Sequence, residues 1–233
     1  MENDQKEMLK IGAEAAMRPF ADLIDKLFGG PVEQIGGMWT DRLAVRRHIR
    51  RISLFGKLQA AIDKARFDPR QIPDNVWIPA IQEASLQDDE TLQEKWANLL
   101  ANASDPRAEG LPPSFPKILS ELSSREARFL DRLYDYLASS DYKPLDIAMS
   151  RPMRRGELFD VYMQADLYDA SAFSIDMDGL LRNRLIESET APLDREALFS
   201  GEPIAEDNEF YRMSSLGKCF VAACLAPSPE PRP

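Results

Sequence analysis

The sequence has few of the residue types on which metal and nucleophilic sites depend. Its 233 residues include one histidine, His48, and two cysteines, Cys219 and Cys224. The cysteines stand five residues apart in a helical pattern, which turns their thiols about 140° away from each other and disfavours a disulfide. We expect both to be buried as small apolar side chains. Without a Cys-x-x-Cys pair, none of the common zinc sites is expected, and a histidine-based triad would have to use His48.

Long apolar runs are missing as well. No 18 consecutive apolar residues occur, and the opening MENDQKEM lacks the apolar core of a signal peptide. We therefore expect no membrane-spanning helix, no export by that route and a cytoplasmic location. The net charge is −10, from 39 acidic and 29 basic residues. Such a surface repels nucleic acid and anionic lipid as a whole, so any contact with either must be local.

What the sequence does contain is helical periodicity in a soluble, globular composition, with 44% apolar and 29% charged residues. The predicted fold is mainly α, with a helical N-terminal domain followed by a winged-helix-like α+β C-terminal domain. The predicted regions are an amphipathic, glycine-interrupted helical region with a basic cluster at 1–75, a core helical pair at 76–118, the winged-helix-like domain at 119–226 and a disordered, proline-rich tail at 227–233.

The first region combines an apolar stripe with a run of arginines. Pro19 lies inside the stripe and predicts a kink or a restart of the helix there. The apolar side chains form a candidate membrane or partner surface: Met17, Phe20, Leu23, Ile24, Leu27, Phe28, Ile35, Met38 and Trp39. A helical pattern over residues 41–66 then carries the basic cluster, whose candidate anion-contacting side chains are Arg42, Arg46, Arg47, Arg50 and Arg51.

Two interpretations of this region remain open. In the first, the apolar stripe enters a membrane from its inner face while the arginines meet lipid phosphates, which makes the protein peripheral at the cell membrane. In the second, an ordinary helical hairpin packs on the rest of the domain or on a second copy, and the arginines pair with acidic neighbours. We favour the second because the polar face of the first helix is mixed in sign, whereas membrane-surface helices are usually basic there.

The helical pair has the clearest local signals. Pro79 suits the first turn of a short helix, and Asp88 is a good N-cap for a second helix with two acidic residues in its first turn. One face of this second helix is expected to be buried: Leu92, Trp96, Leu99, Leu100 and Ala103. Asn98 and Asn102, one turn apart on another side, are expected to make structural hydrogen bonds to a neighbouring loop.

Four sequence features follow one another in a distinctive order: ANLLA at 97–101, Asp105, PSF at 113–115 and LSSREA at 122–127. Their order resembles the abortive-infection alpha (Abi-alpha) family of bacterial proteins, which is associated with defence against phage. The resemblance covers residues 75–135 clearly and the N-terminal half loosely. It implies defence by an abortive route and brings no catalytic residues with it.

The C-terminal region resembles a winged-helix domain, with helical patterns at 123–137, 156–164 and 174–184, a strand at 210–213 and a last helix with a buried face. Winged helices often bind DNA, and Arg182 and Arg184 would be the reading side chains. Residues 119–226, however, hold 20 acidic against 12 basic residues, and residues 187–209 hold eight acidic residues against Arg195 alone. A wing of that composition repels phosphate, so nucleic acid is disfavoured and protein contact or self-association is favoured.

No catalytic, cofactor or metal site is predicted, and the protein is not expected to be an enzyme. The leading hypothesis is an antiphage protein that senses a phage component by protein contact and acts through self-association. Its expected partners are a phage or host protein and further copies of itself. One alternative is a membrane-disrupting effector that uses the N-terminal amphipathic helices, and another is a DNA-binding winged-helix regulator.

Overall fold

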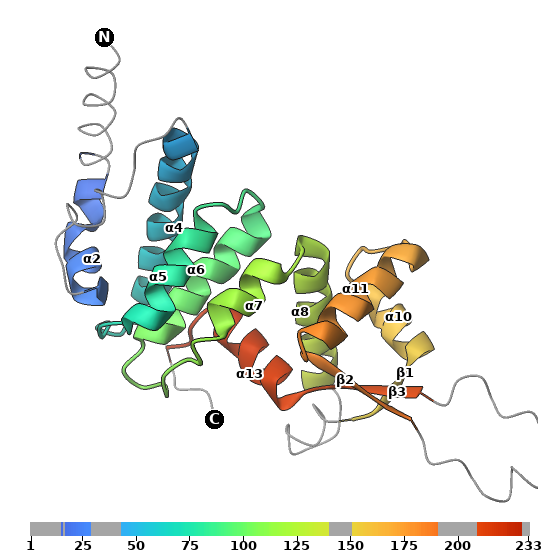
Figure 1. Ribbon diagram of the computed structural model, residues 1–233. Helices are drawn as coiled ribbons and strands as arrows, with labels where there is room; N and C mark the ends of the chain where they lie inside the picture. Colours follow the sequence, from blue (N-terminus) through green and yellow to red (C-terminus); the bar gives the residue numbers. More distant parts are fainter. Residues whose placement is uncertain (1–14, 16, 29–42, 140–150, 191–208, 230–233) are drawn as a thin grey trace, which may run out of the picture. The chain divides into compact units, whose positions relative to one another are not determined.

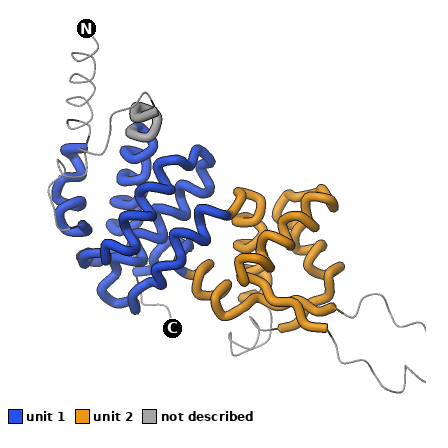
Figure 2. The backbone as a smooth tube through the Cα atoms, viewed as in Figure 1, with its two compact units in different colours: residues 1–121, 223–233 blue, residues 122–222 orange. Residues whose placement is uncertain are grey.

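The computed structural model describes residues 15, 17–28, 43–139, 151–190 and 209–229 (Figure 1). The chain divides into two compact units (Figure 2). Unit 1 comprises residues 1–121 and 223–233, and unit 2 comprises residues 122–222. The sequence analysis placed its boundaries after residues 75, 118 and 226. The structure instead unites the first two predicted regions and returns the last residues of the chain to unit 1.

The regular elements in the described part of unit 1 are all helices. A 3-10 turn at Pro19 precedes helix α2, which confirms the predicted restart. The elements of the unit are η1 (Arg18–Phe20), α2 (Ala21–Phe28), α4 (Leu43–Ala65), α5 (Asp74–Ala84), α6 (Glu90–Ser104) and α7 (Phe115–Glu121). Helices α4 and α6 make the most extensive contact between elements of the unit, so the core lies between them.

The buried face of α6 is the one that its periodicity predicts. Its five apolar side chains are all buried: Leu92, Trp96, Leu99, Leu100 and Ala103. They meet the apolar side of α4, where Leu54, Phe55 and Leu58 are buried too. Burial on this scale, roughly 25 cal/mol per Å² of apolar surface, accounts for the packing of the two helices.

Two local predictions for the helical pair were wrong. The N-cap of α6 is Asp89, whose carboxylate accepts a hydrogen bond from the backbone N–H of Leu92 at 3.1 Å, and not Asp88. Asp88 is directed instead to Arg50 of α4. Pro79 lies inside α5 and not in its first turn, because Pro73 already stands at the N-cap position and starts the helix earlier.

Unit 2 combines helices with a small three-stranded antiparallel sheet, so that the protein as described is mainly helical. Its elements are α8 (Ser124–Ala138), β1 (Met153–Arg154), α10 (Arg155–Met163), α11 (Ala170–Arg182), β2 (Ile186–Thr190), β3 (Glu209–Met213) and α13 (Ser215–Cys224), whose last two residues belong to unit 1. The strand order is β1-β3-β2, and Tyr211 of β3 lies opposite Met153 and Ser188. Of the two cysteines, Cys224 is buried as expected, but Cys219 is exposed.

A buried carboxylate joins three helices of unit 2. Asp176 of α11 accepts two hydrogen bonds from Arg125 of α8, at 2.9 and 3.0 Å, and one from the hydroxyl of Tyr162 of α10 at 2.8 Å. The hydrogen bond and charge of Asp176 raise the pKa of Arg125. Burial and the same hydrogen bond raise the pKa of Tyr162 to about 12, so its hydroxyl stays protonated and donates at neutral pH. This network fixes the orientation of α11.

Candidate functional site

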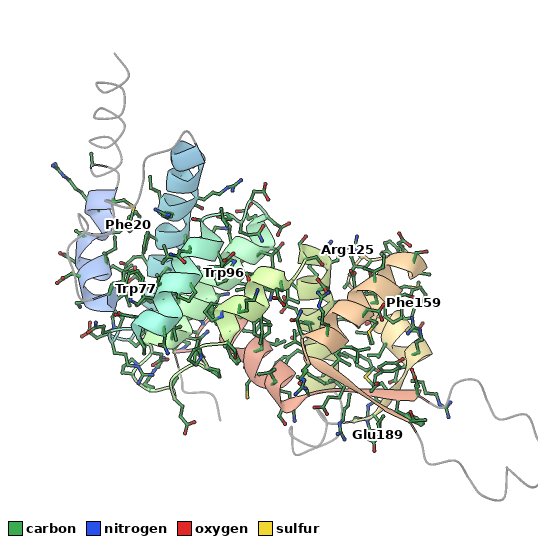
Figure 3. The ribbon with its side chains drawn as sticks, viewed as in Figure 1. Phe20, Trp77, Trp96, Arg125, Phe159 and Glu189 are labelled. Carbon is green, nitrogen blue, oxygen red and sulfur yellow. The ribbon has the colours of Figure 1, made fainter. Side chains whose placement is uncertain are left out.

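Most of the candidate N-terminal surface lies in the core of unit 1. The side chains of Met17, Leu23, Ile24, Leu27 and Phe28 are at most 7% exposed. The ring of Phe20, labelled in Figure 3, stacks on that of Phe55 of α4 at 6.2 Å between centroids, and the ring of Phe28 meets Phe55 edge-on at 6.1 Å. In this arrangement the stripe faces protein, and it could meet lipid only if α2 separated from α4. The remaining members of this surface, Ile35, Met38 and Trp39, lie outside the described residues.

The described part of the arginine cluster is engaged within unit 1. Arg50 donates to the carbonyl oxygen of Leu86 at 2.8 Å and pairs with Asp88 at 3.4 Å. Arg51 is buried at 8% exposure. One turn and more along α4, Lys57 pairs with Glu90. The basic side of α4 therefore faces the acidic start of α6. Arg42 and the side chains of Arg46 and Arg47 lie outside the described residues.

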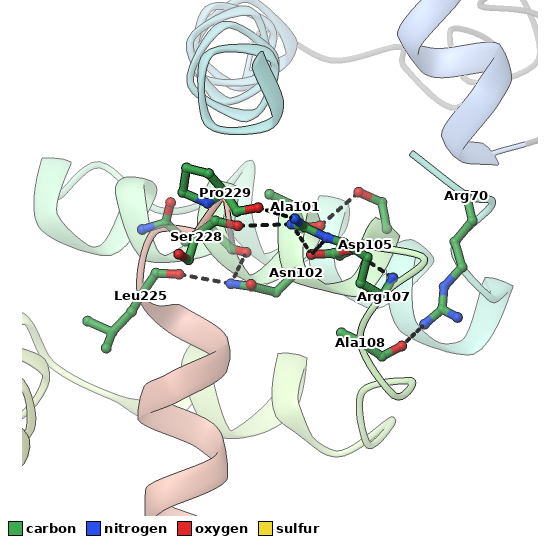
Figure 4. A network of polar contacts seen from close by, with 11 residues as sticks. Arg70, Ala101, Asn102, Asp105, Arg107, Ala108, Leu225, Ser228 and Pro229 are labelled. Atoms are coloured by element: carbon green, nitrogen blue, oxygen red, sulfur yellow. Dashed lines mark hydrogen bonds and ion pairs between the residues drawn. The ribbon is translucent and has the colours of Figure 1, made fainter. Parts of the chain in front are cut away.

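Two asparagines of α6 hold the end of α13 (Figure 4). Asn98 donates through Nδ2 to the carbonyl oxygen of Cys224 at 3.2 Å, and Asn102 donates to those of Ala223 and Leu225 at 2.8 Å each. The last carbonyls of a helix have no partner within it, so these amides satisfy groups that would otherwise be unpaired. The prediction of structural hydrogen bonds is confirmed for both asparagines, but their partners belong to the end of helix α13 and the residue after it, and not to the expected loop.

A second contact lies just beyond, and we call it the tail clamp: Phe67, Asp105 and Arg107. Arg107 donates through its guanidinium to the carbonyl oxygens of Ser228 at 2.9 Å and Pro229 at 2.6 Å. Asp105 holds the same guanidinium through two near-parallel hydrogen bonds of 2.9 and 2.8 Å. Residues 227–229 are therefore tied to unit 1, in contrast to the disordered tail predicted from residue 227.

Electrostatics and stacking keep the clamp arginine in place. Burial by itself would raise the pKa of Asp105, but hydrogen bonds from the side chain and backbone of Arg107 bring it below its ordinary value. The guanidinium also lies over the ring of Phe67, 5.2 Å from its centroid. Arg70 steadies the loop by donating to the carbonyl oxygen of Ala108 at 2.9 Å. The guanidinium is thus positioned by protein on two sides.

Sequence reasoning singled out Asp105 as part of a recurring phrase but missed Arg107 and Phe67. The partners of Arg107 lie 121 and 122 residues further along the chain, and a local sequence pattern cannot predict such a contact. The single available signal was the pair Asp105 and Arg107, two residues apart after a helix, which suits a self-contained ion pair.

In unit 2, one side of helix α11 is exposed, and together with Tyr168, two residues before the helix, we call it the α11 face: Tyr168, Ser171, Ile175, Asp178 and Arg182. Its helical members are spaced four, three and four residues apart, so they share one side. Two of its side chains are large and apolar, with Tyr168 at 72% and Ile175 at 65% exposure. The opposite side of α11 is buried, through Phe173, Met177 and Leu180.

The described strands of unit 2 carry charges of both signs, with Glu187, Glu189 and Glu209 against Arg154 and Arg212. Glu187 and Glu189 of β2 both pair with Arg212 of β3, at 3.1 and 3.5 Å, and Glu209 accepts a hydrogen bond from the hydroxyl of Tyr211. Figure 3 places Glu189 on this hairpin. The basic side chains expected to read DNA, Arg182 and Arg184, are exposed at the end of α11 and directly after it. Arg182 lies one turn after Asp178 on the same side of α11, so a carboxylate adjoins one of the two arginines.

Two other kinds of site are not found in the part of the chain that the structure describes. No group of three or more His, Cys, Asp or Glu residues is placed to hold a metal ion. None of the helices described is both long enough and apolar enough to cross a membrane. The features that remain are two contact surfaces, the tail clamp in unit 1 and the α11 face in unit 2.

Comparison with known proteins gives one match. A family model described as abortive infection alpha matches residues 50–224, which is most of the chain. The match extends well beyond the phrases at 75–135 on which the resemblance was clearest. It includes the clamp residues Phe67, Asp105 and Arg107 and the whole α11 face, and it starts after the N-terminal apolar stripe. Comparisons with curated proteins and with solved structures gave no match.

Proposed function

Because the chain belongs to the abortive infection alpha family, we propose that it is a non-enzymatic antiphage protein that senses a phage component through the α11 face and acts by self-association. Family membership implies a role in abortive infection. How the protein is triggered has to be argued from its surfaces, since function resides in sites and not in folds.

The order of elements in unit 2 supports a winged-helix domain. A helix, a short strand, two helices and a two-stranded hairpin follow one another, and the sheet order β1-β3-β2 places the last strand in the middle. In this proposal α10 and α11 are the helical pair, and β2 and β3 are the paired strands that follow it. The second helix of such a pair is the one that DNA-binding relatives of this architecture lay against their partner. Helix α11 holds that position.

The chemistry of the α11 face favours protein over DNA, and this single observation carries the proposal. Helices that read DNA present arginine, lysine, asparagine or glutamine to base edges. Here the centre of the helical part of the face is Ile175, between Ser171 and Asp178, and Tyr168 is exposed two residues before the helix begins. Isolated exposed apolar residues are common, but an exposed branched aliphatic side chain and an exposed aromatic side chain close to it in sequence match the composition of protein interfaces.

Self-association supplies the second step of the proposal. A protein that is triggered by contact can act if the trigger binds one association state better than another, because the bound partner then shifts the population toward that state. Such an effector needs no reaction of its own.

Phage challenge of cells that carry the protein tests this function. We expect wild-type protein to lower phage yield and Ile175→Asp to lose that protection, since the substitution places a charge in the centre of the α11 face. The matched control is Ile49→Asp, at a helical isoleucine of unit 1 with 61% exposure against 65% for Ile175. Exposed substitutions of this kind usually change stability by less than about 0.5 kcal/mol.

Two results would overturn the proposal. Equal survival and equal phage yield with and without the protein, across a broad phage panel, would remove the antiphage function. Protection lost in Ile49→Asp but kept in Ile175→Asp would remove the α11 face as the sensing surface. Steeply salt-dependent DNA binding that disappears in the double variant Arg182→Gln, Arg184→Gln would instead establish the regulator alternative.

A further inference from the structure

The tail clamp recognises the backbone of the segment that it holds. Arg107 donates to two carbonyl oxygens, those of Ser228 and Pro229. Its guanidinium is oriented in advance by Asp105 and Phe67. A fixed donor aimed at main-chain carbonyls binds a backbone conformation more than a particular sequence.

The bound segment has the chemistry that such a site needs. Residues 226–229 read Ala-Pro-Ser-Pro, and the full tail after Leu225 is APSPEPRP. Proline has no backbone N–H and a fixed φ, so proline-rich chains stay extended and leave their carbonyls free to accept hydrogen bonds. Pro227 is buried against unit 1, whereas its neighbour Ala226 and the following Pro229 are exposed. One proline therefore anchors the segment while Arg107 holds the carbonyls after it.

The anchor of the tail is separate from the anchor of α13. Asn98 and Asn102 hold the carbonyls of residues 223–225, whereas Arg107 holds those of residues 228 and 229. Residues 226–229 belong to no helix or strand. They can leave the clamp without breaking a regular element, while the end of α13 stays in place.

We propose that the tail clamp is a binding site for an extended, proline-rich segment, that the chain's own tail fills it in the resting protein, and that the tail of a second copy can take its place. Exchange of an identical element between copies is an economical route to a dimer. This inference rests on the self-association in the proposed function and names a contact that produces it. A tail on its own chain has a millimolar effective concentration, so exchange between copies occurs when that tail is released.

Peptide binding to the full-length protein tests the site. Pro227→Asp places a charge at a buried position and is expected to expel the tail, which leaves the clamp empty. A fluorescent peptide of residues 225–233 is then expected to bind this variant about 100-fold more tightly than it binds wild type, in which the tail competes. Adding Arg107→Gln is expected to weaken that binding at least about 10-fold by removing two charge-assisted hydrogen bonds. Pro227→Gly, which removes the buried ring without a charge, provides a second open variant.

Two control variants carry their substitution at exposed residues, whereas Pro227 is buried. Ala226→Asp adds the same charge at an exposed position and is expected to bind the peptide as weakly as wild type. Arg18→Gln, at an exposed arginine of unit 1, is expected to leave binding to the open variant unchanged. If neither folded open variant binds the peptide, the clamp is a passive anchor and the inference is wrong, whereas the antiphage proposal is untouched.

Exchange between copies is tested by mixing two defective proteins. Arg107→Gln keeps the tail and loses the clamp, and Pro227→Asp keeps the clamp and loses the tail. Each alone is expected to show less association than wild type. Their mixture is expected to form a mixed dimer by light scattering, because one intact tail meets one intact clamp. Peptide binding without a mixed dimer would overturn the exchange of tails between copies. The measurement does not depend on whether either variant still protects cells against phage.

Discussion

The Nδ2 atom of Asn102 lies 2.8 Å from the carbonyl oxygen of Leu225 and ties helix α6 to the residue directly after α13. The two residues are 123 positions apart in the sequence and both belong to unit 1. The same nitrogen reaches the carbonyl of Ala223, so one amide serves two chain positions at a helix end. Asn102, the second asparagine of the ANLLANA phrase, is therefore a structural residue that joins α6 to the C-terminal segment of unit 1.

Replacement of Asn102 by alanine is expected to lower the free energy of unfolding by about 1–3 kcal/mol. The reason is that the carbonyls of Ala223 and Leu225 lose their donor. Asn75→Ala, at an exposed asparagine of α5, is the control and is expected to change stability by less than about 0.5 kcal/mol. Urea unfolding measures both. Equal stability of Asn102→Ala and Asn75→Ala would contradict the role assigned to Asn102.

The buried carboxylate of unit 2 provides a second prediction. Arg125→Gln removes the cation that pairs with Asp176, which is only 2% exposed. Because the arginine itself is 44% exposed, we expect a moderate loss of about 1–3 kcal/mol and not the full cost of an unpaired buried charge. Arg128→Gln, one turn further along α8 and exposed, is expected to have little effect. A thermal unfolding series would contradict the assignment if the two variants melted together.

Local structure could be predicted from the sequence where it depends on residues that are close together in the chain. The buried face of α6 follows from period 3.6, and the restart of the helix follows from Pro19. The cap of α6 was misplaced by one residue because two adjacent aspartates offer the same chemistry. The choice between them depends on Arg50, which binds Asp88 from another helix.

Contacts between distant residues were not accessible. The apolar stripe that includes Ile24 and Leu27 has the pattern of a membrane-surface helix and of a core helix alike, and only its contact with α4 and α5 shows which one it is in this structure. Arg107 gave no signal because its partners, Ser228 and Pro229, come from the far end of the chain. Periodicity reports one face of one helix, and it does not identify what covers that face.

Two glycines of unit 2 give opposite predictions for the same substitution. A Cβ at Gly217 of α13 would lie 2.1 Å from the backbone oxygen of Leu185, so Gly217→Ala must move the backbone and is expected to cost about 1–3 kcal/mol. A Cβ at Gly156 of α10 meets nothing within 4 Å, so Gly156→Ala is expected to stabilise by about 0.5–1 kcal/mol through helix propensity. Calorimetry of both variants measures the change in stability. An unchanged stability of Gly217→Ala would contradict the close packing of Gly217 against Leu185.

The clamp predicts a pH dependence. The pKa of Asp105 in the folded protein lies below its ordinary value of 3.8 because Arg107 stabilises the carboxylate. A depressed pKa contributes stability that is complete above the unfolded value and is lost as the pH falls from about 4 through the folded value. Asp105→Asn and Arg107→Gln are therefore both expected to flatten the fall in unfolding free energy below pH 4. An unchanged slope in both variants would contradict the interaction.

The central claim is that contact at the α11 face changes the association state of the protein, and light scattering tests it most directly. Purified protein is mixed with the structural proteins of a phage against which it protects, and its molar mass is compared with that of the protein alone. The account predicts a rise in mass beyond a one-to-one complex for wild type and Ile49→Asp, and no rise for Ile175→Asp. An unchanged mass for wild type, or an equal rise for Ile175→Asp, would contradict it.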